Sequence, residues 1–285
     1  MVTSLLNRGL LWTEWKQHWW KCWTALVLMS ITPIISPAFG YIISKFDPNV
    51  SRQLCSAWLD ALLQIAGGDA GQSSLGMVAV WVVLSLGAVL LGEERNQKSI
   101  ECLAAMPVSR QEIVSAKYLL GIMAVIIVML LNLAALSIAV YSLSKPQMHP
   151  AILVWFAVTA SVLLAVYSIA FLAATITGNL AASLMGAITL VFGPQLILTL
   201  ISGLLASHGI ISGDASQMIL DIGRTLTLPE YIKTYKYGET SLMTVPAMLA
   251  VAGTSFALAV KMFENNHLER DGRIIMLDIS LKKRS

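Results

Sequence analysis

Charged residues are absent from several long stretches of this chain, and the lengths of those stretches limit what it can fold into. Four of them hold 21 to 27 uncharged residues, between Lys21 and Lys45, Asp69 and Glu93, Lys117 and Lys145, and Glu239 and Lys261. A helix rises about 1.5 Å per residue, so about 20 residues cross the roughly 30 Å of a bilayer's hydrocarbon. Each stretch is therefore long enough for one transmembrane helix.

A fifth stretch, between Lys145 and Asp214, holds 68 residues without an acidic side chain, lysine or arginine, which is too long for one span. The polar tripeptide Thr177-Gly178-Asn179 near its middle can form a tight turn at a membrane surface. Dividing the stretch there gives two helices. The sequence thus predicts six spans, at about residues 22–43, 75–91, 118–143, 151–176, 180–205 and 242–260.

The composition supports a membrane protein. Hydrophobic residues make up 56% of the 285 residues and charged residues only 12%, whereas an ordinary soluble domain carries roughly 25% charge. So few charges cannot cover a soluble surface of this size. We therefore expect an all-α, polytopic membrane protein that forms a single domain over residues 1–285.

The segment before the first span is rich in tryptophan. Trp12, Trp15, Trp19 and Trp23 are spaced by three, four and four residues, which places them on one face of a helix. Tryptophan prefers the headgroup layer of a membrane. The pattern predicts a helix over residues 5–21 that lies in the membrane interface, either as an aromatic anchor or as a surface that grips a partner.

The basic residues predict the orientation. Thirteen of the 19 lysines and arginines fall in the N-terminal segment, the connection between spans two and three, and the C-terminal tail, and six fall in the other connections. Cytoplasmic segments carry the excess of positive charge, so both termini are expected in the cytoplasm. The charges mark topology, and no basic face indicates nucleic acid as a partner.

The connection between spans two and three, residues 93–117, has strong local signals. Glu94 and Lys98 are an i, i+4 pair in the favourable order, which supports a helix there. Pro107 ends that helix, because the residue before a proline is pushed out of the helical region. Ser109 and Glu112 then form a capping box, so a second helix should begin at Arg110. The two helices predict a rigid elbow at the cytoplasmic surface.

This segment resembles the cytoplasmic signature of ABC transporter permeases of the ABC-2 type. The order of spans and the N-terminal interfacial helix also fit that family, so the resemblance covers the whole chain. Lys98 stands where the family usually has glycine. The matching residues are Glu94, Ser99, Ile100, Glu101, Leu103, Pro107, Val108, Ser109, Arg110, Ile113 and Lys117.

The resemblance implies that residues 93–117 form a coupling helix that docks on a separate ATPase subunit. The chain would then be the permease of an ATP-driven exporter of an amphipathic substrate, such as a peptide antibiotic, a drug or a lipid-like molecule, in a bacterial plasma membrane. The implied assembly has two ATPase subunits and a second permease subunit, identical or related. The contacts to the ATPase would come from Glu94, Arg95, Ser99, Glu101, Leu103, Pro107, Ser109, Arg110 and Lys117.

The chain itself has no sign of an ATP site or of catalysis. A phosphate-binding loop requires a Gly-Lys pair, and none occurs in the sequence. ATP and magnesium are therefore expected in the partner subunit, with no cofactor or metal site in this chain. We expect a transport component that is not an enzyme by itself.

The spans carry a few polar residues that could line a substrate path. Hydrogen bonds between helices explain such residues equally well. Gly193-Pro194 should kink the fifth span, and residues 206–241 are expected to form a long outer loop. The candidates for the path are Asn132, Ser161, Tyr167, Ser168 and Gln195.

Two other functions remain as alternatives. One is a channel or membrane scaffold that needs no partner, although no ring of filter residues is evident. The other is an intramembrane protease, because Glu93-Glu94-x-x-x-Lys98 resembles the Glu-Glu-x-x-x-Arg element of such enzymes. The carboxylates lie at the predicted cytoplasmic surface, and the chain has no His-Glu-x-x-His metal pair.

Overall fold

Short turns separate the helices of this protein, and no strand occurs in the parts of the chain that the structure describes. The computed structural model describes residues 8–30, 74–96, 109–142, 149–235 and 241–265. Their helical content agrees with the predicted fold class. The helices are α1 (Arg8–Ser30), α4 (Ser74–Asn96), α6 (Arg110–Ser142), α7 (His149–Ile176), α8 (Leu180–Ser207), α9 (Gly213–Leu226), α10 (Glu230–Lys233) and α11 (Thr244–Asn265).

Four helices are long and apolar enough to cross a membrane, and they correspond to predicted spans three to six. Their apolar parts are Gln111–Ile138, Pro150–Ile176, Leu180–Ser207 and Thr244–Phe263. The predicted second span lies in α4, whose apolar part, Met77–Gly92, is shorter. Most of the predicted first span, residues 22–43, lies outside the described residues. Six spans therefore remain the prediction, and four are supported by helix length and composition.

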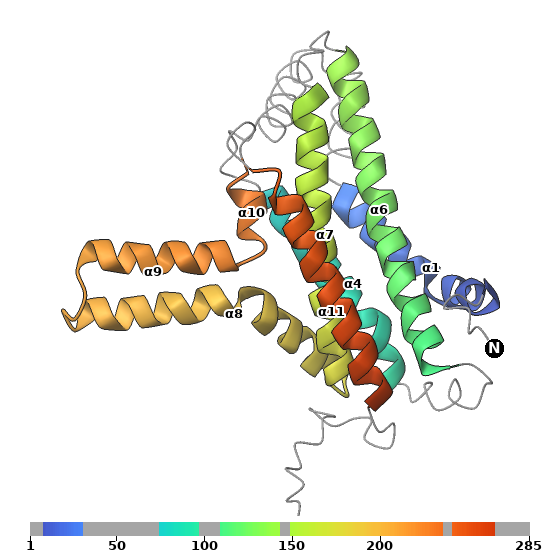
Figure 1. The fold of residues 1–285 in the computed structure, drawn as a ribbon. Helices are drawn as coiled ribbons and strands as arrows, with labels where there is room; N and C mark the ends of the chain where they lie inside the picture. Colours follow the sequence, from blue (N-terminus) through green and yellow to red (C-terminus); the bar gives the residue numbers. More distant parts are fainter. Residues whose placement is uncertain (1–7, 31–73, 97–108, 143–148, 236–240, 266–285) are drawn as a thin grey trace, which may run out of the picture.

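Helix α7 is the centre of the bundle. It packs against α4, α6, α8, α10 and α11 (Figure 1). Of its most apolar window 56% is buried, against 17% for α8. At Gly87 of α4 an added Cβ would lie 2.9 Å from the Tyr167 carbonyl oxygen, so the two backbones approach closely there. The core therefore forms around α7, with α8 packed less deeply.

The predicted turn between the fourth and fifth spans is confirmed. Residues 177–179 separate α7 from α8. Asn179 caps α8, because its side-chain Oδ1 accepts a hydrogen bond of 2.7 Å from the backbone N–H of Ala182. A polar side chain thus satisfies one of the free N–H groups at the helix start.

Helices α8 and α9 form a hairpin that projects sideways from the bundle (Figure 1). The ribbon of α8 changes direction about half-way along its length, where Pro194 lies inside the helix. Gly223 of α9 lets the two helices approach, since an added Cβ would lie 3.3 Å from Leu198. The region expected to be a long outer loop, 206–241, therefore contains two helices, α9 and α10, in its described part.

Helix α1 joins two predicted elements. It passes without a break from the predicted interfacial segment into the first residues of the predicted first span. His18, Cys22 and Ala25 are buried on one side of the helix. The four tryptophans of the predicted stripe are all exposed in the single chain. The shared face predicted from their spacing is confirmed, and it is turned away from the rest of the bundle.

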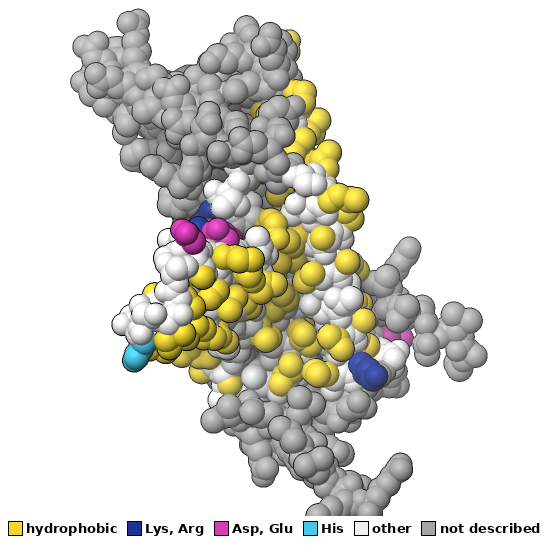
Figure 2. Space-filling model, turned by 60° about the vertical axis from the view of Figure 1, so that its left-hand side comes forward, with side chains coloured by type: hydrophobic (Ala, Val, Ile, Leu, Met, Phe, Trp, Pro, Cys, Tyr) yellow, Lys and Arg dark blue, Asp and Glu magenta, His cyan; other side chains and the backbone are white. Residues whose placement is uncertain are grey.

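Large apolar side chains also cover much of the outside of the molecule. Figure 2 shows them as a broad hydrophobic band across the visible face, with the charged side chains near its margins. Leu130, Leu200 and Leu249 are among those that are exposed. Apolar patches of this extent are rare on soluble monomers. With the long apolar helices, they are typical of a multi-pass membrane protein.

Candidate functional site

The helix ends that flank the predicted coupling segment lie at one end of the bundle. α4 ends there, α6 begins there, and the α7–α8 turn and the end of α11 lie at the same level (Figure 1). Glu94 and Arg95 belong to the last turn of α4. Their side chains are outside the described part of the structure, as are the predicted coupling residues Ser99, Glu101, Leu103 and Pro107.

The capping box at the start of α6 is confirmed. The backbone N–H of Ser109 donates to Oε2 of Glu112 over 2.9 Å, and the backbone N–H of Glu112 donates to Oγ of Ser109 over 3.3 Å. Helix α6 begins at Arg110, as predicted. The negative charge of Glu112 in the first turn also favours the positive end of the helix dipole. The second arm of the elbow is therefore fixed by its own sequence.

Replacing Ser109 with alanine should loosen this helix start. Removing an N-cap hydroxyl costs about 1 kcal/mol, so the Ser109→Ala variant should show faster hydrogen exchange at the backbone amides of residues 110–113. Glu112→Gln is the matched control, because glutamine can keep the reciprocal hydrogen bond. Equal exchange in Ser109→Ala and the unchanged protein would contradict a role for the cap in holding the helix start.

Lys117 is the predicted coupling residue that the structure places deepest. Its side chain is only 1% exposed and has a polar contact within the chain. It lies two turns into α6, next to Tyr118, which is also buried. Lys117 is therefore in the packed base of the helix rather than on its outer surface.

Aromatic side chains tie this base to two other helices. The ring of Tyr118 on α6 stacks on Phe256 of α11, with ring centroids 4.0 Å apart, and packs edge-on against Phe171 of α7 at 5.4 Å. Its hydroxyl lies 2.7 Å from Oγ of Ser168. The single proton of Ser168 is donated to the Leu164 carbonyl, so Tyr118 is the donor to Ser168.

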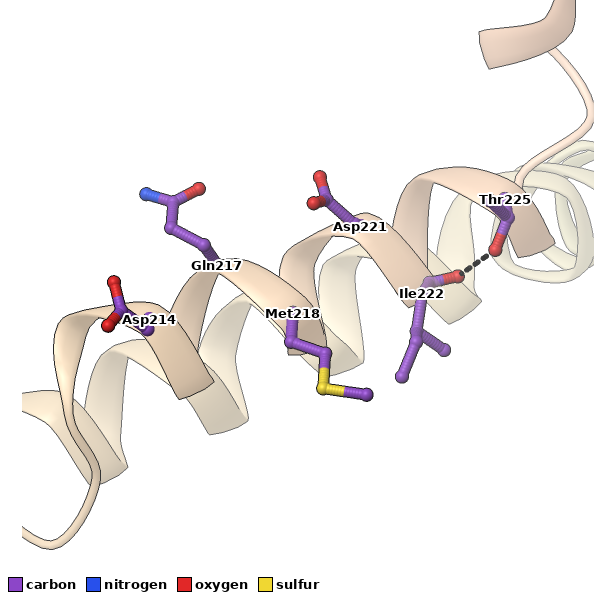
Figure 3. Close-up of a pocket in the computed structure, with 6 residues that line it drawn as sticks. All are labelled: Asp214, Gln217, Met218, Asp221, Ile222 and Thr225. Atoms are coloured by element: carbon purple, nitrogen blue, oxygen red, sulfur yellow. Dashed lines mark hydrogen bonds between the residues drawn. The ribbon is translucent and has the colours of Figure 1, made fainter.

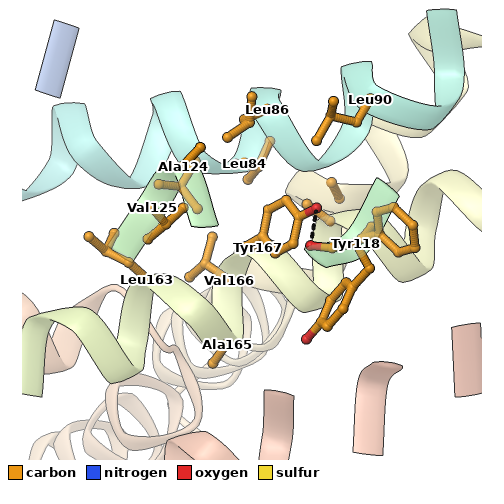
Figure 4. Packing of buried hydrophobic residues seen from close by; sticks show 14 of the residues in the cluster. Leu84, Leu86, Leu90, Tyr118, Ala124, Val125, Leu163, Ala165, Val166 and Tyr167 are labelled. Atoms are coloured by element: carbon orange, nitrogen blue, oxygen red, sulfur yellow. Dashed lines mark hydrogen bonds between the residues drawn. The ribbon is translucent and has the colours of Figure 1, made fainter. Parts of the chain in front are cut away.

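Tyr167 adds a second connection between α6 and α7. Its hydroxyl donates to the backbone carbonyl of Tyr118 over 3.2 Å, as the dashed line in Figure 4 shows. Gly121 makes room for this ring, because an added Cβ would overlap the Tyr167 hydroxyl. The sequence analysis did not identify Tyr118 or Gly121 as functional. A small residue one turn after Lys117 and Tyr118 was the available signal, but it does not name its partner on another helix.

The five candidates for a substrate path do not surround one space. Tyr167 and Ser168 are buried in the aromatic cluster, and the hydroxyl of Ser161 donates to the Val158 carbonyl of its own helix. Asn132 lies against α1, where its side-chain Nδ2 is 3.5 Å from the Met29 carbonyl oxygen. Gln195 lies on α8 near Gly223 of α9. In this single chain they act as contacts within and between helices.

Two surface depressions lie elsewhere on the described residues. One follows the exposed side of α9, where Asp214, Gln217 and Asp221 line one edge and Met218 and Ile222 the other (Figure 3). It is formed by a single helix and is widely open to the outside. The other lies between α1 and α4.

Comparison with known protein families decides the assignment. A family profile described as ABC-2 family transporter protein matches residues 51–264, about three quarters of the chain. The chain belongs to the ABC-2 transporter family. The matched region includes the whole predicted coupling segment. No curated protein and no solved structure gives a significant match.

Membership in the ABC-2 family defines the general role of the chain. Such proteins are membrane components of transporters and are not catalytic themselves. The apolar helices and the apolar exterior fit that role. This ABC-2 protein is therefore a multi-pass membrane protein of a transport system, as the resemblance of its coupling segment implied.

Proposed function

We propose that this ABC-2 protein is the permease subunit of an ATP-driven exporter, which couples ATP hydrolysis in a separate subunit to export of an amphipathic molecule. The observation that carries the proposal is the family match over residues 51–264, which includes the coupling segment. ATP and magnesium would bind in the ATPase subunit. Two ATPase subunits and a second permease subunit, identical or related, would complete the transporter.

The proposed mechanism begins at the elbow. An ATPase would dock on residues 93–117, between the end of α4 and the start of α6. Closure of two ATPase subunits around ATP would move this segment. The capped start of α6 supports the transfer of that movement, because the helix is held firmly from its first residue.

The aromatic cluster supports the next step. Tyr118 connects α6 to α7 and α11, so a tilt of α6 at its base would pull on all three helices. α4 packs against α7 as well and would follow. In this mechanism Glu94 and Arg110 are surface contacts to the ATPase, whereas buried Lys117 positions the base of α6.

In the proposed orientation, the end of the bundle that carries the elbow faces the cytoplasm. The excess of lysine and arginine on the flanking segments supports this arrangement, with both termini inside a bacterial plasma membrane. The substrate would leave at the opposite end, near the α8–α9 hairpin.

The proposal is tested by purifying the chain from its native membrane with an affinity tag. We expect a soluble ATPase with a Walker motif to copurify, and we expect the complex to hydrolyse ATP. A matched variant, in which residues 97–108 are replaced by a glycine-serine linker of equal length, should insert normally but lose the ATPase. Recovery of no ATPase with the unchanged chain, or equal recovery with the linker variant, would contradict the proposal.

A further inference from the structure

A groove between α1 and α4 has features that the transport mechanism does not use. Its volume is about 190 Å3, and its walls come from residues 20–28 of α1 and 82–89 of α4. Leu28, Val82 and Val89 give it an apolar surface. The hydroxyl of Ser85 lies in the wall but donates to the Val82 carbonyl over 2.8 Å, so its proton is already used. Most of the groove can therefore take only an apolar group.

One end of the groove carries a positive charge. Lys21 is the only charged residue among those that line it. Its side chain is 5% exposed, and its Nζ lies 5.8 Å from the centroid of the Trp20 ring. An ammonium group has three donor protons, so a contact within the chain leaves donors for a ligand. The groove thus combines an apolar wall with a cation at one end.

The place of Lys21 in the sequence sets its depth in the membrane. It directly precedes the 23 uncharged residues that lead to Lys45, so it stands where the chain enters the hydrocarbon. Trp19 and Trp23 beside it are exposed, which fits the headgroup layer. The lysine therefore lies at headgroup depth, and the apolar wall lies beside the acyl chains.

The dimensions of the groove select its ligand. Pockets for drug-sized molecules hold about 300–1,000 Å3, and this groove is smaller. Eight or nine residues of helix span about 12 Å, which is close to the roughly 15 Å depth of one hydrocarbon leaflet. A narrow slot of that length suits one acyl chain.

We propose that this groove binds one anionic phospholipid, with its phosphate at Lys21 and an acyl chain along Leu28, Val82 and Val89. A basic residue between helices at headgroup level is the arrangement that recognises acidic headgroups. A zwitterionic lipid carries its own cation beside the phosphate, so it gains less from Lys21. The site does not depend on the proposed transport function, because lipid can bind without ATP or an ATPase.

The test compares phosphatidylglycerol with phosphatidylcholine of identical acyl chains, added to the full-length protein in detergent. Bound lipid is counted by native mass spectrometry over a range of lipid concentrations. We expect tighter binding of phosphatidylglycerol. Lys21→Gln should weaken that binding roughly fivefold, the effect of one lysine beside an acidic headgroup, and leave phosphatidylcholine unchanged. Lys21→Arg should keep the preference.

Two further variants complete the experiment. Lys16→Gln removes an exposed lysine of the same helix outside the groove and should change nothing. Ser85→Phe should fill the slot and weaken both lipids. The proposal is overturned if the two lipids bind equally to the unchanged protein, or if Lys21→Gln behaves like Lys16→Gln. It is also overturned if Ser85→Phe changes the oligomeric state without changing lipid binding, because a second copy would then cover the groove.

Discussion

Replacing Gly121 with alanine should destabilise the protein by about 1–3 kcal/mol, the usual cost of forcing extra atoms into a packed core. A Cβ at this position would overlap the hydroxyl and ring of Tyr167. That ring is 0% exposed and its hydroxyl is bonded to the Tyr118 carbonyl, so it has no free space to enter. Helices α6 and α7 would have to separate. The expected result is a lower apparent melting temperature of the purified protein in detergent.

A second glycine provides the matched control. Gly253 of α11 also lies in a membrane helix, but an added Cβ would meet nothing within 4 Å. Gly253→Ala should therefore leave the melting temperature unchanged or raise it slightly, since alanine favours a helix by up to about 1 kcal/mol. If Gly121→Ala and Gly253→Ala behave alike, the close packing of Gly121 against Tyr167 is not what holds α6 to α7.

The double variant identifies the partner. Tyr167→Ala alone should destabilise the protein by leaving a cavity. Combined with Gly121→Ala, it removes the ring that the new methyl group would strike. The cost of the double variant should therefore be clearly less than the sum of the two single costs, because residues in direct contact are not additive. Additive costs would place the effect of Gly121 elsewhere.

The features that could be predicted from sequence are those set by neighbouring residues. The 177–179 turn, the start of α6 at Arg110 and the helices of spans three to six follow from uncharged stretches and from capping side chains within one turn. Such contacts form between residues three or four positions apart. The sequence alone therefore contains them.

Contacts between distant helices could not be predicted in the same way. Tyr118 and Ser168 are 50 residues apart, and nothing in the order of the chain shows that their hydroxyls meet. Their pairing depends on how α6 rotates against α7. That rotation is set by the whole interface, including the space at Gly121. The polar residues assigned to a substrate path belong to the same class of contact.

Helix α9 is a different kind of omission, because its sequence did carry a signal. Asp214, Gln217, Asp221 and Arg224 are spaced by three, four and three residues, which is the period of a helix. Ser212 caps the helix, its hydroxyl accepting from the N–H of Ala215 over 3.4 Å. The charges were interpreted as a solvated loop. Their spacing was the better guide.

Removing both outer charges of the elbow should uncouple transport from ATP hydrolysis. We expect the Glu94→Ala, Arg110→Ala double variant to insert at normal levels, because neither residue lies within an apolar span. Surface contacts at a protein interface contribute on the order of 1–2 kcal/mol each, so the amount transported per ATP hydrolysed should fall at least tenfold. The measurement is ATP-dependent uptake of a fluorescent amphipathic dye into inverted vesicles that contain the chain and its copurified ATPase.

The control separates a coupling contact from a general effect of charge. Lys261 is exposed on α11 toward the same end of the bundle, outside the elbow. Lys261→Ala should therefore keep the normal ratio of transport to hydrolysis. If the double variant also keeps that ratio, the ATPase does not act through the charges at the end of α4 and the start of α6. A loss confined to the double variant would instead mean that force enters at these two helix ends, from which Tyr118 can pass it to α7 and α11.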